Sequence, residues 1–162
     1  MFDFPLGFSV VELIQAMLAP GIMISACGLL LLGMNNKYSL VVGRIRLLNE
    51  EKRRFYKHVS ERELAFDEEV RLKSIATQLQ ELYLRVKLVR NAVLCYSSAV
   101  GIFVITSIII GVTAFVQSTP VFLAGFTAFC MGMLLVLAGV YFAAKETIKG
   151  YQIVGFEIKA DE

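Results

Sequence analysis

The side chains that could perform catalysis or bind a metal ion are few and widely separated in this sequence. The one histidine, His58, has no constellation of carboxylates or cysteines around it. Cys27, Cys95 and Cys130 fall in three different apolar stretches, where we expect them to be small packing residues. The sequence has no phosphate-binding glycine loop, no metal-ligand spacing and no G-x-S-x-G motif. We therefore expect no catalytic residue, cofactor site or metal site, and no enzymatic activity.

The side chains that could recognise a partner are mainly basic, and they gather in one part of the chain. Thirteen of the sixteen lysines and arginines lie between Lys37 and Arg90. Acidic residues are interleaved with them, so the net charge is only +2, which argues against a nucleic-acid-binding protein. Some of these cations lie near the ends of apolar stretches, where they could contact lipid headgroups or dock an acidic partner. These candidates are Arg44, Arg46, Arg85, Lys87 and Arg90.

Three long apolar stretches separate the charged segments and predict the fold. The chain is 57% hydrophobic with a mean hydropathy of +0.66. Residues 13–34, 92–116 and 121–144 each exceed the roughly 20 residues that a helix needs to cross the hydrocarbon of a bilayer. Residues 1–12 contain no basic residue, so we expect the first stretch to be a retained span and not a cleavable signal. The sequence predicts an all-α membrane protein with three transmembrane helices.

The distribution of basic residues predicts how the chain is oriented. The connection between the first two spans, residues 35–91, carries most of them, whereas the link between the second and third spans carries none. By the positive-inside rule, residues 35–91 and the tail at 145–162 are cytoplasmic, and the N-terminal segment 1–12 is outside.

Residues 35–91 contain a heptad pattern on both sides of a predicted turn at 58–60. The turn is indicated by Ser60-Glu-Arg-Glu63, a capping box that starts a new helix. The sequence therefore predicts an antiparallel coiled-coil hairpin between spans one and two, in which Val41 faces Leu79, Ile45 faces Ile75 and Leu48 faces Leu72. The seam residues are Tyr38, Val41, Ile45, Leu48, Lys52, Phe55 and Val59 on the first arm, and Leu72, Ile75, Leu79, Leu82, Val86, Val89 and Val93 on the second.

Small residues recur within the spans at helical spacing and are candidates for close helix packing, either within one chain or between copies. They are Gly21, Ser25 and Gly28 in span one, Ser97 and Gly101 in span two, and Ala124, Ala128 and Gly132 in span three. No charged residue lies within the three spans, which argues against ion-coupled transporters and voltage sensors. Hydroxyl groups that could line a pore are those of Thr106, Ser107, Thr113 and Thr127.

The first third of the chain also carries a family resemblance. Ala19-Pro20, the run from Ile24 to Leu31, Asn35-Asn36 and the run from Val42 to Arg46 resemble the bacterial membrane family of domain of unknown function 2721. The resemblance implies the three-span fold and a bacterial inner membrane, and it implies no activity. The layout is also similar to that of membrane-protein insertases with a coiled coil between spans one and two.

Two functions remain open at this point. The first is a non-enzymatic homo-oligomer that acts as a pore or a membrane scaffold. Apolar residues beside the predicted seam motivate it, namely Leu40, Leu47, Leu84 and Leu88. The alternative is an accessory subunit or insertase-like factor whose hairpin docks a cytoplasmic or membrane protein. The expected partners are therefore membrane lipids, further copies of the chain and possible partner proteins, with no nucleic acid.

Overall fold

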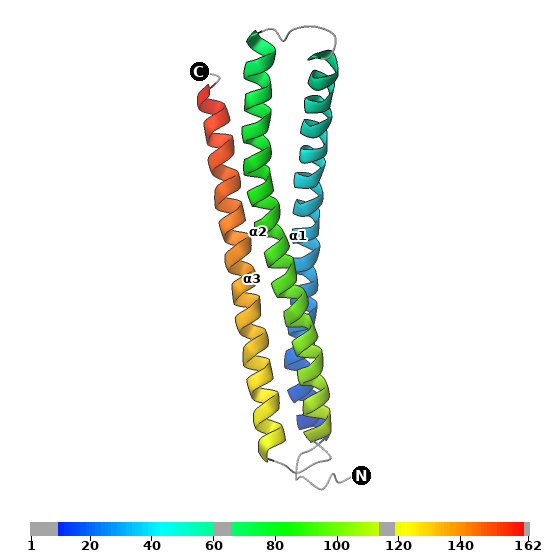
Figure 1. The fold of residues 1–162 in the computed structure, drawn as a ribbon. Helices are drawn as coiled ribbons and strands as arrows, with labels where there is room; N and C mark the ends of the chain where they lie inside the picture. The colour runs from blue at the N-terminus through cyan, green and yellow to red at the C-terminus, as the bar shows by residue number, and fades with distance from the viewer. Residues whose placement is uncertain (1–9, 60–65, 114–118, 161–162) are drawn as a thin grey trace. The chain divides into compact units, whose positions relative to one another are not determined.

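The computed structural model describes residues 10–59, 66–113 and 119–160, and each of these ranges is a helix (Figure 1). Helix α1 spans Val10–Val59, α2 spans Phe66–Thr113 and α3 spans Thr119–Ala160. Each helix contains a segment long and apolar enough to cross a membrane. The described chain is therefore all-α with three candidate membrane helices, as its three apolar stretches predict.

Each helix continues beyond the span predicted within it. Helix α1 ends at Val59, and residues 60–65, which contain the predicted capping box, lie outside the described residues. Helix α3 continues to Ala160, so residues 145–160 of the predicted tail are helical. Hydropathy does not predict this helical extension, because the apolar run that marks the span stops at Ala144.

The described residues form two compact units. Unit 1 contains residues 10–33, 91–113 and 119–141, and unit 2 contains residues 34–59, 66–90 and 142–160. Within each unit, segments of all three helices lie side by side, with α2 antiparallel to α1 and α3 (Figure 1).

Buried positions recur at heptad spacing on all three helices. On α1 one residue is buried in every seven, and on α2 two residues are buried in most heptads from Val89 to Thr106. Heptad spacing keeps a buried stripe facing its neighbour along a long helix. The buried residues are Pro20, Cys27, Met34, Val41 and Leu48 on α1, Ile75, Val89, Ala92, Tyr96, Ala99, Phe103 and Thr106 on α2, and Gly125, Gly132, Gly139 and Glu146 on α3.

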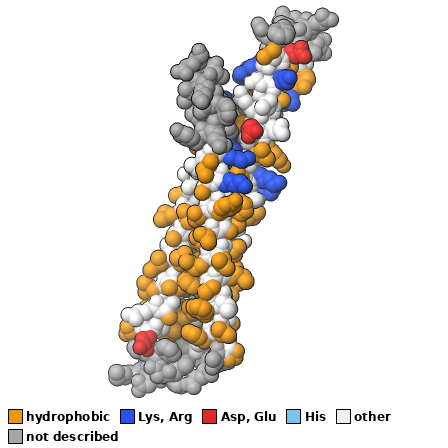
Figure 2. All heavy atoms as spheres, turned by 90° about the vertical axis from the view of Figure 1, so that its left-hand side faces the viewer, with side chains coloured by type: hydrophobic (Ala, Val, Ile, Leu, Met, Phe, Trp, Pro, Cys, Tyr) orange, Lys and Arg blue, Asp and Glu red, His pale blue; other side chains and the backbone are white. Residues whose placement is uncertain are grey.

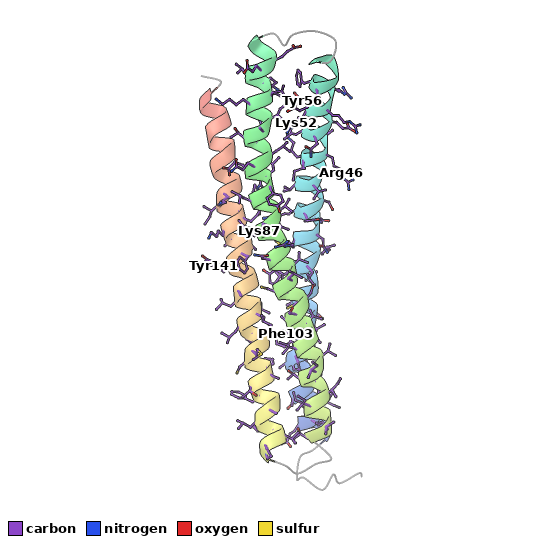
Figure 3. All side chains as sticks on the ribbon, in the orientation of Figure 1. Arg46, Lys52, Tyr56, Lys87, Phe103 and Tyr141 are labelled. Carbon is purple, nitrogen blue, oxygen red and sulfur yellow. The ribbon has the colours of Figure 1, made fainter. Side chains whose placement is uncertain are left out.

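In unit 1, glycines of α3 pack against large side chains of α2. A Cβ atom on Gly139 would lie 2.6 Å from the Tyr96 ring, and one on Gly132 would lie 2.7 Å from the Phe103 ring. The rings therefore occupy the space that a larger α3 residue would need. Phe103, labelled in Figure 3, is fully buried, and its ring centroid lies 5.6 Å from that of Phe129.

In unit 2, the residues of the predicted seam are largely withdrawn from solvent. Val41, Leu48, Ile75 and Val89 are buried, and so is Met34, which precedes the first arm. Tyr38 differs, because 41% of its surface is exposed. Half-buried seam residues are Ile45, Lys52, Phe55, Leu72, Leu79, Leu82 and Val86.

An ion pair connects α1 and α2 within unit 2. Arg71 Nε donates to Glu51 Oε1 at 2.9 Å. Under the predicted register Glu51 would face residue 69, and its observed partner lies two residues further along α2. Further toward the end of α1, the Lys52 ammonium lies 5.9 Å from the centre of the Tyr56 ring (Figure 3).

Candidate functional site: an ion-pair cluster and its basic surroundings

A buried carboxylate in unit 2 joins all three helices. Glu146 of α3 is 1% exposed and lies seven residues after Gly139, on the stripe of α3 that also contains Gly125 and Gly132. In unit 1 that stripe packs glycine against α2. Glu146 occupies the next position of this stripe with a charged side chain. A buried charge needs ion-pair or hydrogen-bond partners, because leaving it unpaired strongly destabilises the folded state.

Both carboxylate oxygens of Glu146 have cationic partners. Arg85 of α2 donates to Oε1 through Nη2 at 2.7 Å and through Nε at 3.2 Å. Lys37 of α1 donates to Oε2 from Nζ at 3.1 Å. Charge-assisted bonds of this kind are about twice as strong as neutral hydrogen bonds. The cluster therefore ties α1 and α2 to α3 through one side chain.

Neighbouring residues complete this arrangement. Lys37 Nζ also donates to Thr147 Oγ1 at 2.9 Å, and the Thr147 hydroxyl donates to the Ala143 carbonyl at 3.0 Å. Gly150 leaves room for the Arg85 guanidinium, since a Cβ atom there would lie 2.9 Å from Nη2. The carboxylate is thus fully engaged, and its evident chemical role is to connect helices.

The ion-pair cluster contains one of the five basic residues that were predicted to contact lipid or a partner. Arg85 was expected to contact lipid or a partner, and the structure gives its guanidinium an internal acceptor in Glu146. Arg44, Arg46, Lys87 and Arg90 are exposed, and within the described ranges the structure shows no ion pair for them. Figure 3 labels Arg46 and Lys87, and Figure 2 shows Lys and Arg side chains gathered on unit 2.

Glu146 was not among the predicted site residues, because it lies in the segment 145–162 that was predicted only as a cytoplasmic tail. Two signals could have identified it. It continues the seven-residue spacing of Gly125, Gly132 and Gly139, and it is the one carboxylate between Glu81 and Glu157.

The structure separates the predicted small packing residues into two groups. Gly132 is buried against Phe103. Gly21, Gly28 and Gly101 are exposed, and a Cβ atom on any of them would meet nothing within 4 Å. Ser25, Ser97 and Ala124 are also exposed and Ala128 is half-buried, while the Ser25 hydroxyl donates to the Gly21 carbonyl at 3.3 Å. Packing within one chain therefore uses Gly132 and leaves most of the others on the surface.

Unit 1 contains an apolar cleft of about 340 Å³ between the three helices. Pro20 of α1, Ile110 of α2 and Phe126 of α3 are among its lining residues. Thr106 and Thr113 also line it, but their hydroxyls donate to the carbonyls of Ile102 and Ile109 in their own helix. The cleft therefore presents few free polar groups.

The described residues contain no group of three or more His, Cys, Asp or Glu side chains that could hold a metal ion. The three cysteines are free thiols. Cys27 is buried with Ala99 and Phe103 in the core of unit 1.

Comparison with known proteins gives one match, which is to a protein family. No curated protein and no solved structure matches the chain. The model of the family described as "Protein of unknown function (DUF2721)" matches residues 17–155, which include most of both compact units, the ion-pair cluster and most of the three helices. The chain therefore belongs to the DUF2721 family.

Proposed function

We propose that this protein is a non-enzymatic membrane scaffold that assembles as a homo-oligomer in a bacterial inner membrane. In this proposal α1, α2 and α3 each cross the bilayer once, and the N-terminus is outside. Residues 35–91 form an antiparallel coiled-coil hairpin in the cytoplasm, and the C-terminal part of α3 lies beside it.

The ion-pair cluster supports this topology. Lys37 and Arg85 both contact Glu146, so these three points of the chain lie on the same side of any membrane that the helices cross. An arrangement with three spans satisfies that condition, because it places the hairpin and the C-terminal part of α3 on the same side of the membrane. The thirteen lysines and arginines between Lys37 and Arg90 favour the cytoplasm as that side.

The main observation in support of a homo-oligomer is that leucines are exposed on the proposed hairpin. Leu40 and Leu47 lie seven residues apart on one face of α1 and are 75% and 62% exposed. By helical rise Leu47 lies about 20 Å beyond Met34, where the predicted span ends, so lipid does not cover it. Exposed apolar surface of this kind favours association between copies.

Exposed small residues in the spans support the same conclusion. Gly21, Ser25 and Gly28 form a surface of α1 that the single chain leaves open. Surfaces made of small residues allow helices of neighbouring copies to approach closely in lipid. There, helix association is stabilised by van der Waals packing and by polar contacts.

A scaffold is favoured over a pore because of the hydroxyl groups. Thr106, Ser107, Thr113 and Thr127 donate to the carbonyls of Ile102, Phe103, Ile109 and Ala124 in their own helices. A water-filled pore needs polar groups that face the channel, and these hydroxyl protons are already engaged.

Light scattering of the purified protein in mild detergent tests this proposal. We expect a homo-oligomer for the native chain, and a shift toward monomer for Leu40→Gln combined with Leu47→Gln. The matched control replaces Tyr56 and Val70, which are 58% and 53% exposed elsewhere in unit 2, with Gln and should leave the mass unchanged. A native chain that is monomeric both in detergent and in lipid nanodiscs would contradict the proposal.

The alternative is an accessory or insertase-like factor whose hairpin docks another protein. The exposed Tyr83 and Leu84 of α2, beside Lys87, favour this alternative, since they add an apolar surface next to a basic group. Replacing Tyr83 and Leu84 with Gln should then release a co-purifying protein without changing the oligomeric mass. Quantitative mass spectrometry of the purified sample measures that release.

A further inference from the structure

Positive charge in unit 2 is concentrated in the part of the chain nearest the predicted spans. Residues 34–50, 81–90 and 142–150 together contain eight lysines and arginines and three carboxylates. The outer part of the hairpin, residues 51–80, contains seven lysines and arginines and six carboxylates. The charge excess therefore belongs to the inner part of unit 2.

Glu146 neutralises only part of this excess. It engages Arg85 and Lys37, and the Arg85 side chain is 24% exposed. Lys87 and Arg90 remain on the surface of α2, three residues apart and so on neighbouring positions of the same helix face. The part of the chain that the structure describes shows no carboxylate paired with either of them.

The distance of each cation from the predicted span decides what it can reach. The headgroup layer of a bilayer is about 5–8 Å thick on each side. By helical rise Arg90 lies about 3 Å and Lys87 about 8 Å from Ala92, where span two begins. Arg44 and Arg46 lie about 15 and 18 Å beyond Met34, which is outside the headgroup layer and within about two Debye lengths of it. Arg53 and Arg54 lie about 30 Å away.

We propose that Lys87 and Arg90 form a binding site for the phosphate groups of anionic phospholipids. Arg44 and Arg46 strengthen phosphate binding at this site from a longer distance, through the positive electrostatic potential that they add. Lipid is favoured over an acidic protein because the two α2 cations lie at the depth of the headgroups, where phosphate is abundant. The proposal goes beyond the scaffold function: it rests on the proposed placement of span two in the bilayer and not on assembly, since both residues come from one helix of one chain.

Native mass spectrometry of the full chain from nanodiscs of equal phosphatidylglycerol and phosphatidylcholine tests this proposal. The measured quantity is the ratio of the two lipids that remain bound. Lys87→Gln with Arg90→Gln should lower the ratio about tenfold, and Arg44→Gln with Arg46→Gln about two- to threefold, because a basic residue loses effect with distance from the surface. Arg53→Gln with Arg54→Gln is the matched control and should leave the ratio unchanged.

A second variant separates binding from folding. Lys87→Arg with Arg90→Lys keeps both charges and should keep the native ratio, whereas a merely misfolded protein would lose it. Equal ratios for the native chain and the Lys87/Arg90 neutral variant would overturn the proposal. An equal fall in the Arg53/Arg54 control would also overturn it, since the loss would then follow net charge and not position. Loss of a co-purifying acidic protein with an unchanged lipid ratio would assign the site to a protein.

Discussion

Arg85 Nη2 and Glu146 Oε1 lie 2.7 Å apart and form an ion pair between α2 and α3. Glu146 follows Gly139 by one heptad, and Gly139 packs against Tyr96 of the same α2 helix. One stripe of α3 thus uses two different contacts with α2. In unit 1 the contact is glycine against an aromatic ring, and in unit 2 it is carboxylate against guanidinium.

Substitutions in the ion-pair cluster should differ in cost according to burial. Glu146→Gln should lower the free energy of unfolding by about 3 kcal/mol, because it leaves two cations without their counter-charge. Lys37→Gln should cost under about 1 kcal/mol, because the lysine side chain is 44% exposed and water can replace its bond. Unfolding in mixed detergent, followed by circular dichroism, measures both values.

Charge exchange is the control for this prediction. Glu146→Arg combined with Arg85→Glu should recover part of the stability that either substitution alone removes. Equal losses for Glu146→Gln and Lys37→Gln, or no recovery in the exchanged pair, would show that the cluster does not hold α3 against α2.

The glycines that contact aromatic rings should tolerate no larger residue. Gly139→Ala places a Cβ atom 2.6 Å from the Tyr96 ring, so the two helices must separate or the ring must move. Overpacking of this kind typically costs about 1–3 kcal/mol. Gly111→Ala is the matched control, since a Cβ atom there meets nothing within 4 Å. Thermal unfolding of both variants measures the difference, and similar midpoints would contradict the described packing.

The proposed topology predicts which engineered cysteines react from each side. In a chain whose native cysteines are replaced with serine, Arg54→Cys and Lys149→Cys should react with a membrane-impermeant maleimide in inside-out vesicles. Ser118→Cys, in the predicted link between spans two and three, should react in right-side-out vesicles. Labelling of Arg54→Cys and Lys149→Cys from opposite sides would rule out the three-span arrangement.

The helices were predictable because their signals are local. Uncharged runs of more than 20 residues identify candidate membrane helices without reference to any other part of the chain. The burial of Val41, Leu48 and Ile75 was also predictable, because the heptad pattern of each arm marks the side that is withdrawn from water.

The ion-pair cluster was not predictable in the same way. Its three members are 48 and 61 residues apart along the chain, and their meeting depends on how α3 lies against α1 and α2. The apolar run of span three stops at Ala144, so hydropathy alone gives no reason to continue α3. The packing glycines of α3 were only partly predictable for a related reason. Gly125, Gly132 and Gly139 pack against α2 at seven-residue spacing, and the four-residue pattern of Ala124, Ala128 and Gly132 includes only one of them.

The number of chains per particle in native lipid tests the scaffold proposal most directly. Nanodiscs formed straight from the membrane keep the surrounding lipid, and single-molecule photobleaching of a labelled chain counts the copies in each disc. The proposal predicts a uniform assembly of two or more copies, which Leu40→Gln with Leu47→Gln reduces to single chains. One copy per disc at native expression, unchanged by those substitutions, would contradict it.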